Sequence, residues 1–238
     1  MYSFDSRVRY SEVDENRKLS VTGIMNYLQD CSTFQSEDLG MGIDYLRKEN
    51  RAWWLSAWQI VVLRYPELGE RIQVSTWPYE FKGIYGYRNF TIRDAAGEYL
   101  VKANSTWFFF DTVAGRPIRA GEKDIRGYGT GKEERLEMDY APRRIVLPDV
   151  YQEGEPIPVA RHHIDTNHHV NNAQYVEIAR ELLPCEAKIR ELRVEYKKAA
   201  VLGDVMIPQY SSQDGCETIA LCDKEGTPYA VVWLRLGC

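Results

Sequence analysis

The chain has 238 residues, of which 44% are hydrophobic and 27% charged, and its formal net charge is -5. This composition excludes a disordered or fibrous protein, and the excess of negative charge disfavours a general role on nucleic acid. No run of ~18 apolar residues predicts a membrane-spanning helix, and the N-terminal residues lack the apolar region of a secretory signal. We therefore expect a cytoplasmic protein without a membrane span.

The first predicted elements are a helix and several strands. Ser20 and Thr22 are good N-caps, and Gly40 can take the left-handed conformation that ends a helix. The apolar residues that recur at helical spacing between them are Ile24, Met25, Leu28 and Cys31. Among the strands that follow, 58–63 and 107–110 are nearly continuous apolar runs, which is expected of strands buried on both faces.

Residues 127–160 predict a linker, because they contain several glycines, four prolines and runs of charge. We therefore divide the chain into a first unit, 1–126, and a second unit, 161–238. The five cysteines are odd in number and lack the paired spacing of a zinc site. We expect free thiols, no metal and no cofactor.

The second unit repeats the first. Residues 164–167, Ile-Asp-Thr-Asn, match residues 13–16, Val-Asp-Glu-Asn, and a helical pattern follows each segment. Further on, residues 198–204 match residues 64–70. The repeat therefore consists of two long units rather than short motifs.

Each unit predicts one long helix followed by antiparallel strands, an α+β fold. The second helix begins after Asn171 or Asn172, both good N-caps, and stops by Pro184. The hairpin turns Asp94–Gly97 and Asp223–Gly226 occupy corresponding places, and each supplies the glycine that a positive φ requires.

All four histidines of the chain fall within residues 161–172. If this segment is extended as far as Val170, its side chains alternate between two faces. The side chains on one face are then His163, Asp165, Asn167 and His169. The segment thus brings a carboxylate, a carboxamide and imidazoles together directly before a helix.

These groups suit the hydrolysis of a thioester. The reaction needs a base or an attacking carboxylate, an orienting group, and donors for the developing oxyanion. Asp165 and His169 can supply the first, and Asn167 the second. The N–H groups at the start of the following helix can supply the third.

The alternative is purely structural. Asp165 and Asn167 can form an Asx-turn, as Asp14 and Asn16 can in the first unit, where histidine is absent. We interpret His162 and His168 as surface residues. Adjacent histidines in an extended chain point to opposite faces, so a metal site is not expected.

The run 165–175, Asp-x-Asn-x-His-Val-Asn-Asn-x-x-Tyr, resembles the active-site motif of plant and bacterial acyl-acyl carrier protein (acyl-ACP) thioesterases. The first unit is also similar to that family, and the resemblance covers nearly the whole chain. The segments that carry it are Arg-Tyr-Ser-Glu-Val at 9–13, Met-Asn-Tyr-Leu-Gln-Asp at 25–30, Trp-Trp-Leu-Ser-Ala-Trp-Gln-Ile at 53–60 and Arg-Tyr-Pro at 64–66.

The resemblance implies two tandem hotdog units, in each of which an antiparallel sheet wraps a long helix. It implies hydrolysis of fatty acyl-ACP to free fatty acid and holo-ACP, with Asp165, Asn167 and His169 as catalytic residues and the first unit holding the acyl chain. Acyl carrier protein would be the partner, and a homodimer stays open. The alternatives are an acyl-CoA thioesterase and a non-catalytic acyl-binding protein.

One position departs from the family pattern. The family usually carries a glutamate in the strand after the helix, and Ala199 stands at that place. Asp165 would then activate water alone, or another carboxylate would substitute for the missing one. The candidates are Glu195, on the same face of the strand as Ala199, and Glu177 on the helix. Reduced activity is the third alternative.

Two further features have two interpretations each. The aromatic residues of 53–58 and 107–110 belong either to the sheet core or to an acyl pocket. The pairs Lys197–Lys198 and Arg143–Arg144 form either a basic docking patch or an ordinary solvated surface.

Overall fold

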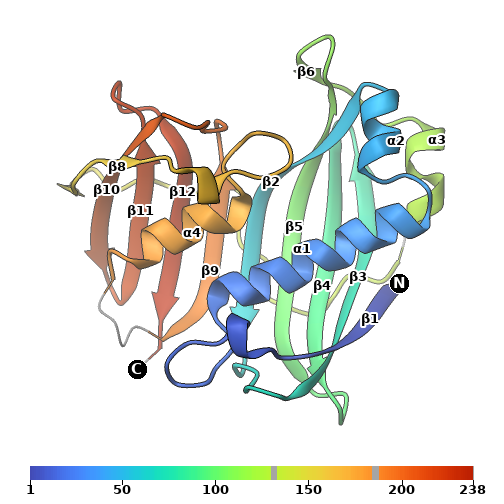
Figure 1. The fold of residues 1–238 in the computed structure, drawn as a ribbon, viewed down its shortest axis with the longest axis horizontal. Coiled ribbons are helices and arrows are strands. Elements are labelled where there is room, and N and C mark those ends of the chain that lie inside the picture. Colours follow the sequence, from blue (N-terminus) through green and yellow to red (C-terminus); the bar gives the residue numbers. More distant parts are fainter. Residues whose placement is uncertain (130–132, 184–187, 238) are drawn as a thin grey trace. The chain divides into compact units, whose positions relative to one another are not determined.

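The computed structural model describes residues 1–129, 133–183 and 188–237. The chain divides into two compact units, Met1–Ser56 with Ile60–Tyr140 and Ala57–Gln59 with Ala141–Cys238. Within each unit one long helix lies across an antiparallel sheet (Figure 1), which confirms the predicted α+β fold. None of the helices in the described ranges combines the length and the apolar character needed to span a bilayer.

The sheet of the first unit has the strand order β1–β3–β4–β5–β2, and β6 pairs with β5. The pairs β1–β3, β3–β4 and β4–β5 are antiparallel. The elements in chain order are β1 (Tyr2–Arg7), the 3₁₀ helix η1 (Tyr10–Glu12), α1 (Val21–Asp38), α2 (Ile43–Lys48), β2 (Arg51–Val62), β3 (Arg71–Lys82), β4 (Tyr85–Asp94), β5 (Tyr99–Asp111), β6 (Arg116–Pro117), α3 (Glu122–Ile125) and the 3₁₀ helix η2 (Arg126–Tyr128).

Helix α1 has the bounds that the sequence predicts. The side chain of Ser20 accepts the Gly23 N–H at 3.0 Å, and Gly40, with φ of 68°, follows the helix end. Its apolar face is buried and packs on β3. The residues with 2% exposure or less on this face are Ile24, Met25, Leu28 and Cys31.

The sheet of the second unit has the order β9–β12–β11–β10–β7, and β8 pairs with β10. All these strand pairs are antiparallel. The elements in chain order are β7 (Gln152–Glu153), β8 (Ile157–Pro158), the 3₁₀ helix η3 (Arg161–His163), α4 (Asn172–Arg180), β9 (Ile189–Tyr196), β10 (Val205–Gln213), β11 (Cys216–Cys222) and β12 (Pro228–Leu236).

Helix α4 is the second predicted helix, and its N-cap is Asn171, the first of the two candidates. The side chain of Asn171 accepts the Ala173 N–H at 2.9 Å. The helix ends at Arg180, before Pro184, which lies outside the described residues. Its buried residues include Val176 and Ala179, and it packs on β11 and β12.

The segment predicted as a linker contributes buried residues to both units. In the first unit, Leu136 is buried with Trp77 and Tyr79. In the second unit, Ile145 is buried with Ala220 and Val231. Two apolar side chains of this polar, proline-containing stretch are thus part of two different hydrophobic clusters.

The internal repeat appears in the backbone hydrogen bonds. Leu19 N donates to Pro66 O at 2.8 Å, and Val170 N donates to Ala200 O at 2.9 Å. The bond from Val8 N to the carbonyl of Glu70, at 3.0 Å, likewise has a counterpart from Val159 N to the carbonyl of Asp204, at 2.8 Å. Both residue alignments inferred from the sequence are therefore confirmed.

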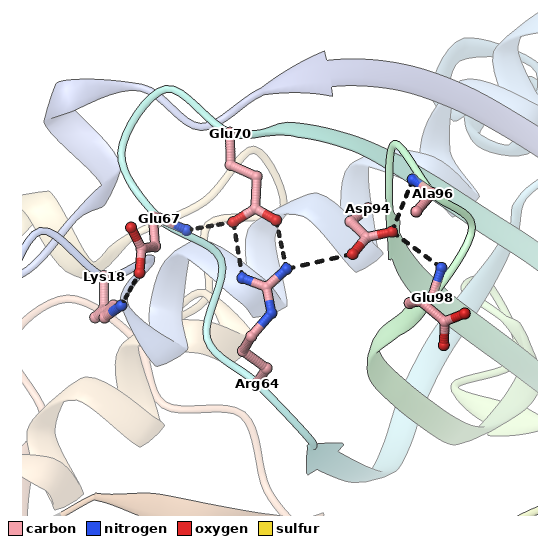
Figure 2. A network of polar contacts seen from close by, with 7 residues as sticks. All are labelled: Lys18, Arg64, Glu67, Glu70, Asp94, Ala96 and Glu98. Atoms are coloured by element: carbon pink, nitrogen blue, oxygen red, sulfur yellow. Dashed lines mark hydrogen bonds and ion pairs between the residues drawn. The ribbon is translucent and has the colours of Figure 1, made fainter.

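Both predicted hairpin turns form, and each is closed by the side chain of an aspartate. Asp94 Oδ1 accepts the N–H groups of Ala96 and Glu98 at 2.9 and 3.0 Å, and Asp94 Oδ2 lies 3.5 Å from Arg64 (Figure 2). In the second unit, Asp223 accepts two N–H groups in the same way and pairs with Lys198 at 2.8 Å.

We expect Asp94→Ala to lower the free energy of unfolding by about 1–2 kcal/mol, because two backbone donors of the turn lose their acceptor. Asp94→Asn keeps the acceptor and loses only the partly exposed ion pair with Arg64, so its effect should stay below about 1 kcal/mol. Urea denaturation of both variants and the wild type measures the loss in the free energy of unfolding for each variant. Equal losses would mean that the ion pair, and not the turn, stabilises this corner.

Candidate functional site

The three predicted catalytic residues lie in one tight turn that precedes α4. Asp165 N donates to His169 O at 2.8 Å, and His168 N donates to Asp165 O at 3.1 Å. His168 has φ of 61°, a left-handed conformation that reverses the chain. Asp165 and His169 are half-buried and Asn167 is exposed.

The expectation of an extended segment up to Val170 is wrong. Residues 161–163 form the 3₁₀ helix η3, and Ile164 and Val170 face each other as an antiparallel bridge across the turn. A hairpin-like reversal, and not strand alternation, brings the three side chains into five consecutive residues. His163 is set apart from them, because it is buried in η3.

The carboxylate of Asp165 also organises the turn. Its Oδ1 accepts the Asn167 N–H at 2.7 Å and the His169 N–H at 3.4 Å. Asp14 does the same in the first unit, where it accepts the N–H groups of Asn16 and Lys18 at 3.0 and 2.9 Å. The Asx-turn expected as the structural alternative therefore exists in both units, and the turn alone does not distinguish a reactive unit from an inert one.

One of the differences between the two turns is the residue at the place of His169. The corresponding residue of the first unit is Lys18, which forms an ion pair with Glu67 across to the β2–β3 connection (Figure 2). The place of Glu67 in the second unit is taken by Val201, which is 42% exposed. An ion pair thus occupies in the first unit the position that carries an imidazole in the second.

Three of the N–H groups around the start of α4, where oxyanion donors are expected, already have acceptors inside the protein. Asn171 N donates to His163 O at 2.8 Å, Ala173 N to the Asn171 side chain, and Gln174 N to Asn171 O at 2.9 Å. The expectation that these three groups bind an oxyanion is therefore not supported. The side-chain amide of Asn167 is exposed and can donate a hydrogen bond at the surface.

Two tyrosines hold the start of α4 against the strand β9 and its following loop. Tyr196 donates to Asn172 O at 2.9 Å, and the hydroxyl of Tyr175 accepts the Ala200 N–H at 2.9 Å. Burial raises the pKa of Tyr196 well above its usual value. Burial, with a contribution from the charge of Asp165, raises the pKa of Tyr175 to about 12. Both phenols therefore stay neutral and act as fixed supports.

The structure places Ala199 outside the strand, because β9 ends at Tyr196, and Ala199 is exposed. The expectation that Glu195 and Ala199 share a strand face is therefore wrong. Glu195 is buried, accepts the Ile145 N–H at 3.0 Å and pairs with Lys197 at 3.1 Å. It fixes the chain at residue 145 and is not available as a substitute base. Glu177 Oε2 lies 3.9 Å from Arg180 Nη1 on the same helix, α4.

Of the two pairs that could form a basic patch, Lys197–Lys198 is paired with carboxylates. Lys197 pairs with Glu195, and Lys198 pairs with Asp223 and lies over the ring of Tyr229 at 5.0 Å. Both lysines thus belong to the local structure of their unit, which favours the interpretation as an ordinary surface.

The aromatic residues of β2 and β5 form two groups, one around Trp53 and one around Trp54, because adjacent side chains of a strand point to opposite faces. Trp54 stacks on Phe110 with ring centroids 3.9 Å apart, and Trp53 lies 4.7 Å from Phe109. Phe109 is 1% exposed, whereas Trp53 and Trp54 are half-buried. The sheet core therefore accounts for Phe109.

No group of three or more His, Cys, Asp or Glu side chains within residues 1–129, 133–183 and 188–237 could hold a metal ion. Cys31, Cys216 and Cys222 are free thiols, as predicted, and burial raises the pKa of Cys31 to about 12. Cys185 and Cys238 lie outside the described residues.

Solved structures share this fold across almost the whole chain. An acyl-ACP thioesterase from Bacteroides thetaiotaomicron superposes with a TM-score of 0.89 at 22% identity, covering 99% of this chain and 97% of that one. The 12:0-ACP thioesterase from Umbellularia californica superposes with a TM-score of 0.84 at 22% identity, with the same coverage. These similarities establish two tandem hotdog units.

Curated relatives carry related names. The palmitoyl-acyl carrier protein thioesterase of Arabidopsis thaliana is 24% identical over 227 residues, which are 88% of this chain and 54% of that protein. The dodecanoyl-[acyl-carrier-protein] hydrolase of Cinnamomum camphora is 25% identical over 221 residues, 84% of this chain and 56% of that protein. The chain thus spans about half the length of the curated relatives it matches.

Family models match both units. Residues 1–127 match the acyl-ACP thioesterase N-terminal domain, and residues 149–227 match the C-terminal domain of the same family. Each unit thereby has its own counterpart in one two-domain family. The chain belongs to the acyl-ACP thioesterase family.

Proposed function

We propose that the protein hydrolyses fatty acyl-ACP thioesters to free fatty acid and holo-ACP. The observation that carries this proposal is the match of both units, in order, to the two domains of the acyl-ACP thioesterase family. The names of the two curated relatives given above describe hydrolysis of palmitoyl and dodecanoyl thioesters of acyl carrier protein. A role in fatty acid synthesis and a cytoplasmic location belong to the same proposal, although the curated plant relatives are chloroplastic.

In this proposal the chemistry belongs to the turn 165–169. Asp165 and His169 take a proton from water as it attacks the thioester carbonyl, and Asn167 orients the reacting groups through its exposed amide. The tetrahedral intermediate then collapses, the carbon–sulfur bond breaks, and the proton passes to the leaving thiolate of the phosphopantetheine arm. The first unit, in which an ion pair replaces the imidazole, holds the acyl chain.

Ala199 leaves the second unit without the glutamate that the resemblance leads one to expect. Glu195 does not replace it, because its carboxylate is bound to the backbone of Ile145. We therefore propose that Asp165 and His169 activate water without a further carboxylate from β9. Variants at these two positions, described in the Discussion, test this assignment.

The substrate assignment predicts a higher kcat/KM on acyl-ACP than on the matching acyl-CoA. Recognition of a carrier protein adds binding energy that a nucleotide does not supply, and binding energy from parts of the substrate remote from the reacting bond contributes to kcat/KM. Steady-state hydrolysis of one acyl group on acyl carrier protein, on CoA and on N-acetylcysteamine measures this difference. The last substrate carries neither protein nor nucleotide and serves as the control.

Equal or greater efficiency on acyl-CoA would contradict the carrier-protein assignment and favour an acyl-CoA thioesterase. Tight acyl-ACP binding without turnover would favour the acyl-binding alternative. Because Lys197 and Lys198 are paired with carboxylates, the preference for acyl-ACP should persist when both are replaced by glutamine.

A further inference from the structure

His163 and Glu12 occupy corresponding places in the two units and make the same pair of hydrogen bonds. Asn171 N donates to His163 O at 2.8 Å, and Ser20 N donates to Glu12 O at 2.9 Å, so each residue's carbonyl fixes the N-cap of the long helix. Each side chain also closes its own 3₁₀ turn. The closing donor is Ala160 N, 3.0 Å from His163 Nδ1, in the second unit, and Arg9 N, 2.9 Å from Glu12 Oε2, in the first.

The difference lies in the chemistry of the acceptor. An imidazole nitrogen can accept a hydrogen bond only while it carries no proton, so the bond from Ala160 N requires neutral His163 with its proton on Nε2. Protonation would turn Nδ1 into a donor that faces another donor. The carboxylate of Glu12 keeps its acceptor oxygens at every pH at which it is ionised.

The surroundings of His163 also favour the neutral ring. His163 is 8% exposed, and burial followed by the charge of His162 lowers the pKa of His163 below its usual value. The two rings lie 4.1 Å apart. In the first unit, Tyr27 donates to Glu12 at 2.7 Å, whereas the residue at the corresponding place of α4 is Ile178, which has no donor.

The described part of the chain shows no ion pair to His163. The charged neighbour that acts on its ring is His162 on the same 3₁₀ helix, and α4 presents the apolar Ile178 at the position that Tyr27 occupies in the first unit. His163 therefore ends η3 as a neutral hydrogen-bond acceptor, and its backbone joins η3 to the N-cap residue of α4.

We propose that His163 is a positioning residue for the turn of Asp165, Asn167 and His169, and that the turn keeps its shape only while this imidazole is neutral. The proposal rests on the proposed function, since the turn is the reacting site only if the protein is a thioesterase. His163 acts through the backbone of Ala160 and Asn171 and does not touch the substrate. At this place the first unit has a carboxylate acceptor, Glu12, and the second unit has an imidazole acceptor, His163, which protonation abolishes.

The sign of the pH dependence follows from the lowered pKa. An unfolded chain protonates His163 near pH ~6.5, whereas the folded protein resists protonation until a lower pH. The contribution of the cap to stability is therefore complete above about pH 6.5 and is lost as the pH falls through the lowered pKa of the folded state.

The first experiment is an NMR titration of the histidine rings in the wild-type protein, which does not depend on activity. We expect His163 to hold its proton on Nε2 and to titrate below pH ~6.5, and His162→Ala to raise the pKa of His163 by removing a like charge. A proton on Nδ1 at neutral pH, or an unshifted pKa, would overturn the proposal. This outcome is independent of whether the protein hydrolyses acyl-ACP.

The second experiment compares kcat for acyl-ACP in His163→Leu and His163→Asn at pH 8. Leucine removes the acceptor, and we expect kcat to fall about tenfold or more with little change in KM, because the turn is displaced. Asparagine places an oxygen where Nδ1 lies and should restore most of kcat. Because asparagine does not titrate, the acid side of the wild-type kcat/KM profile should contain one protonation more than that of His163→Asn.

The control is His162→Ala, which should keep wild-type kcat at pH 8. If His163→Leu does not fold, the comparison of wild type with His163→Asn across pH carries the test alone. Identical acid limbs in these two proteins, or equal kcat in the leucine and asparagine variants, would overturn the positioning role. Absence of acyl-ACP hydrolysis by the wild type would instead overturn the proposed function and leave the titration as the test of the hydrogen bond.

Discussion

Asp165→Asn is expected to lower kcat for acyl-ACP hydrolysis by about 10²-fold or more, which is the scale of losing a general base or its partner. The asparagine keeps an oxygen that can accept the N–H groups of Asn167 and His169, so the turn should persist. What it loses is the negative charge and the ability to take a proton. Steady-state kinetics at saturating substrate, with circular dichroism to verify folding, measures the effect.

The first unit offers a matched control for this variant. Asp14 closes the same turn with the same two hydrogen bonds, so Asp14→Asn perturbs an equivalent structure that lacks the imidazole. We expect wild-type kcat from Asp14→Asn. If both variants lose activity equally, the loss comes from the turn and not from chemistry. If Asp165→Asn keeps near-wild-type turnover, Asp165 has no part in the reaction.

His169→Ala should also lower kcat by about 10²-fold or more, because the imidazole is the group of the turn best suited to exchange a proton near neutral pH. The backbone carbonyl of His169, which accepts the Asp165 N–H at 2.8 Å, is unchanged by the substitution. The turn should therefore survive. Free imidazole added to the variant should restore part of the activity if the lost group is a proton acceptor.

His168→Asn is the control for this second variant. His168 is exposed and has φ of 61°, a conformation that asparagine adopts more readily than most residues, so its backbone should not change. We expect wild-type kcat, in agreement with the interpretation of His168 as a surface residue. A loss as large as that of His169→Ala would show that the second histidine of the pair takes part, and a fully active His169→Ala would remove His169 from the mechanism.

Much of each unit could be predicted because its signals are local. The N-caps Ser20 and Asn171 and the turns closed by Asp94 and Asp223 depend on residues within four positions of one another, and all four are found as expected. The repeat was visible because the residues that form these local bonds recur at corresponding places. The family resemblance depends on other short segments, such as 53–60, 64–66 and 165–175.

The structure differs from the sequence predictions at 161–170 and at Ala199, where the local sequence is compatible with two backbone conformations. Alternating polar residues in 161–170 fit an extended strand, but the left-handed backbone of His168 and the side chain of Asp165 close a turn instead. The sequence predicts Ala199 on a strand because nothing local ends the strand before it, yet the ladder of β9 with β12 ends at Tyr196. Pairing with a partner strand decides such boundaries, and the sequence of one strand does not contain its partner.

The sequence by itself determined the order of elements, the duplicated plan and the residues that form the candidate site. Only the tertiary structure decided the roles of Glu195, Lys198 and His163, whose partners Ile145, Asp223 and Ala160 are set by packing or by backbone geometry. The reason is physical. A carboxylate, an ammonium or an imidazole acquires its function from what it is hydrogen-bonded to and how far it is buried, and both depend on chain segments that the fold brings into contact.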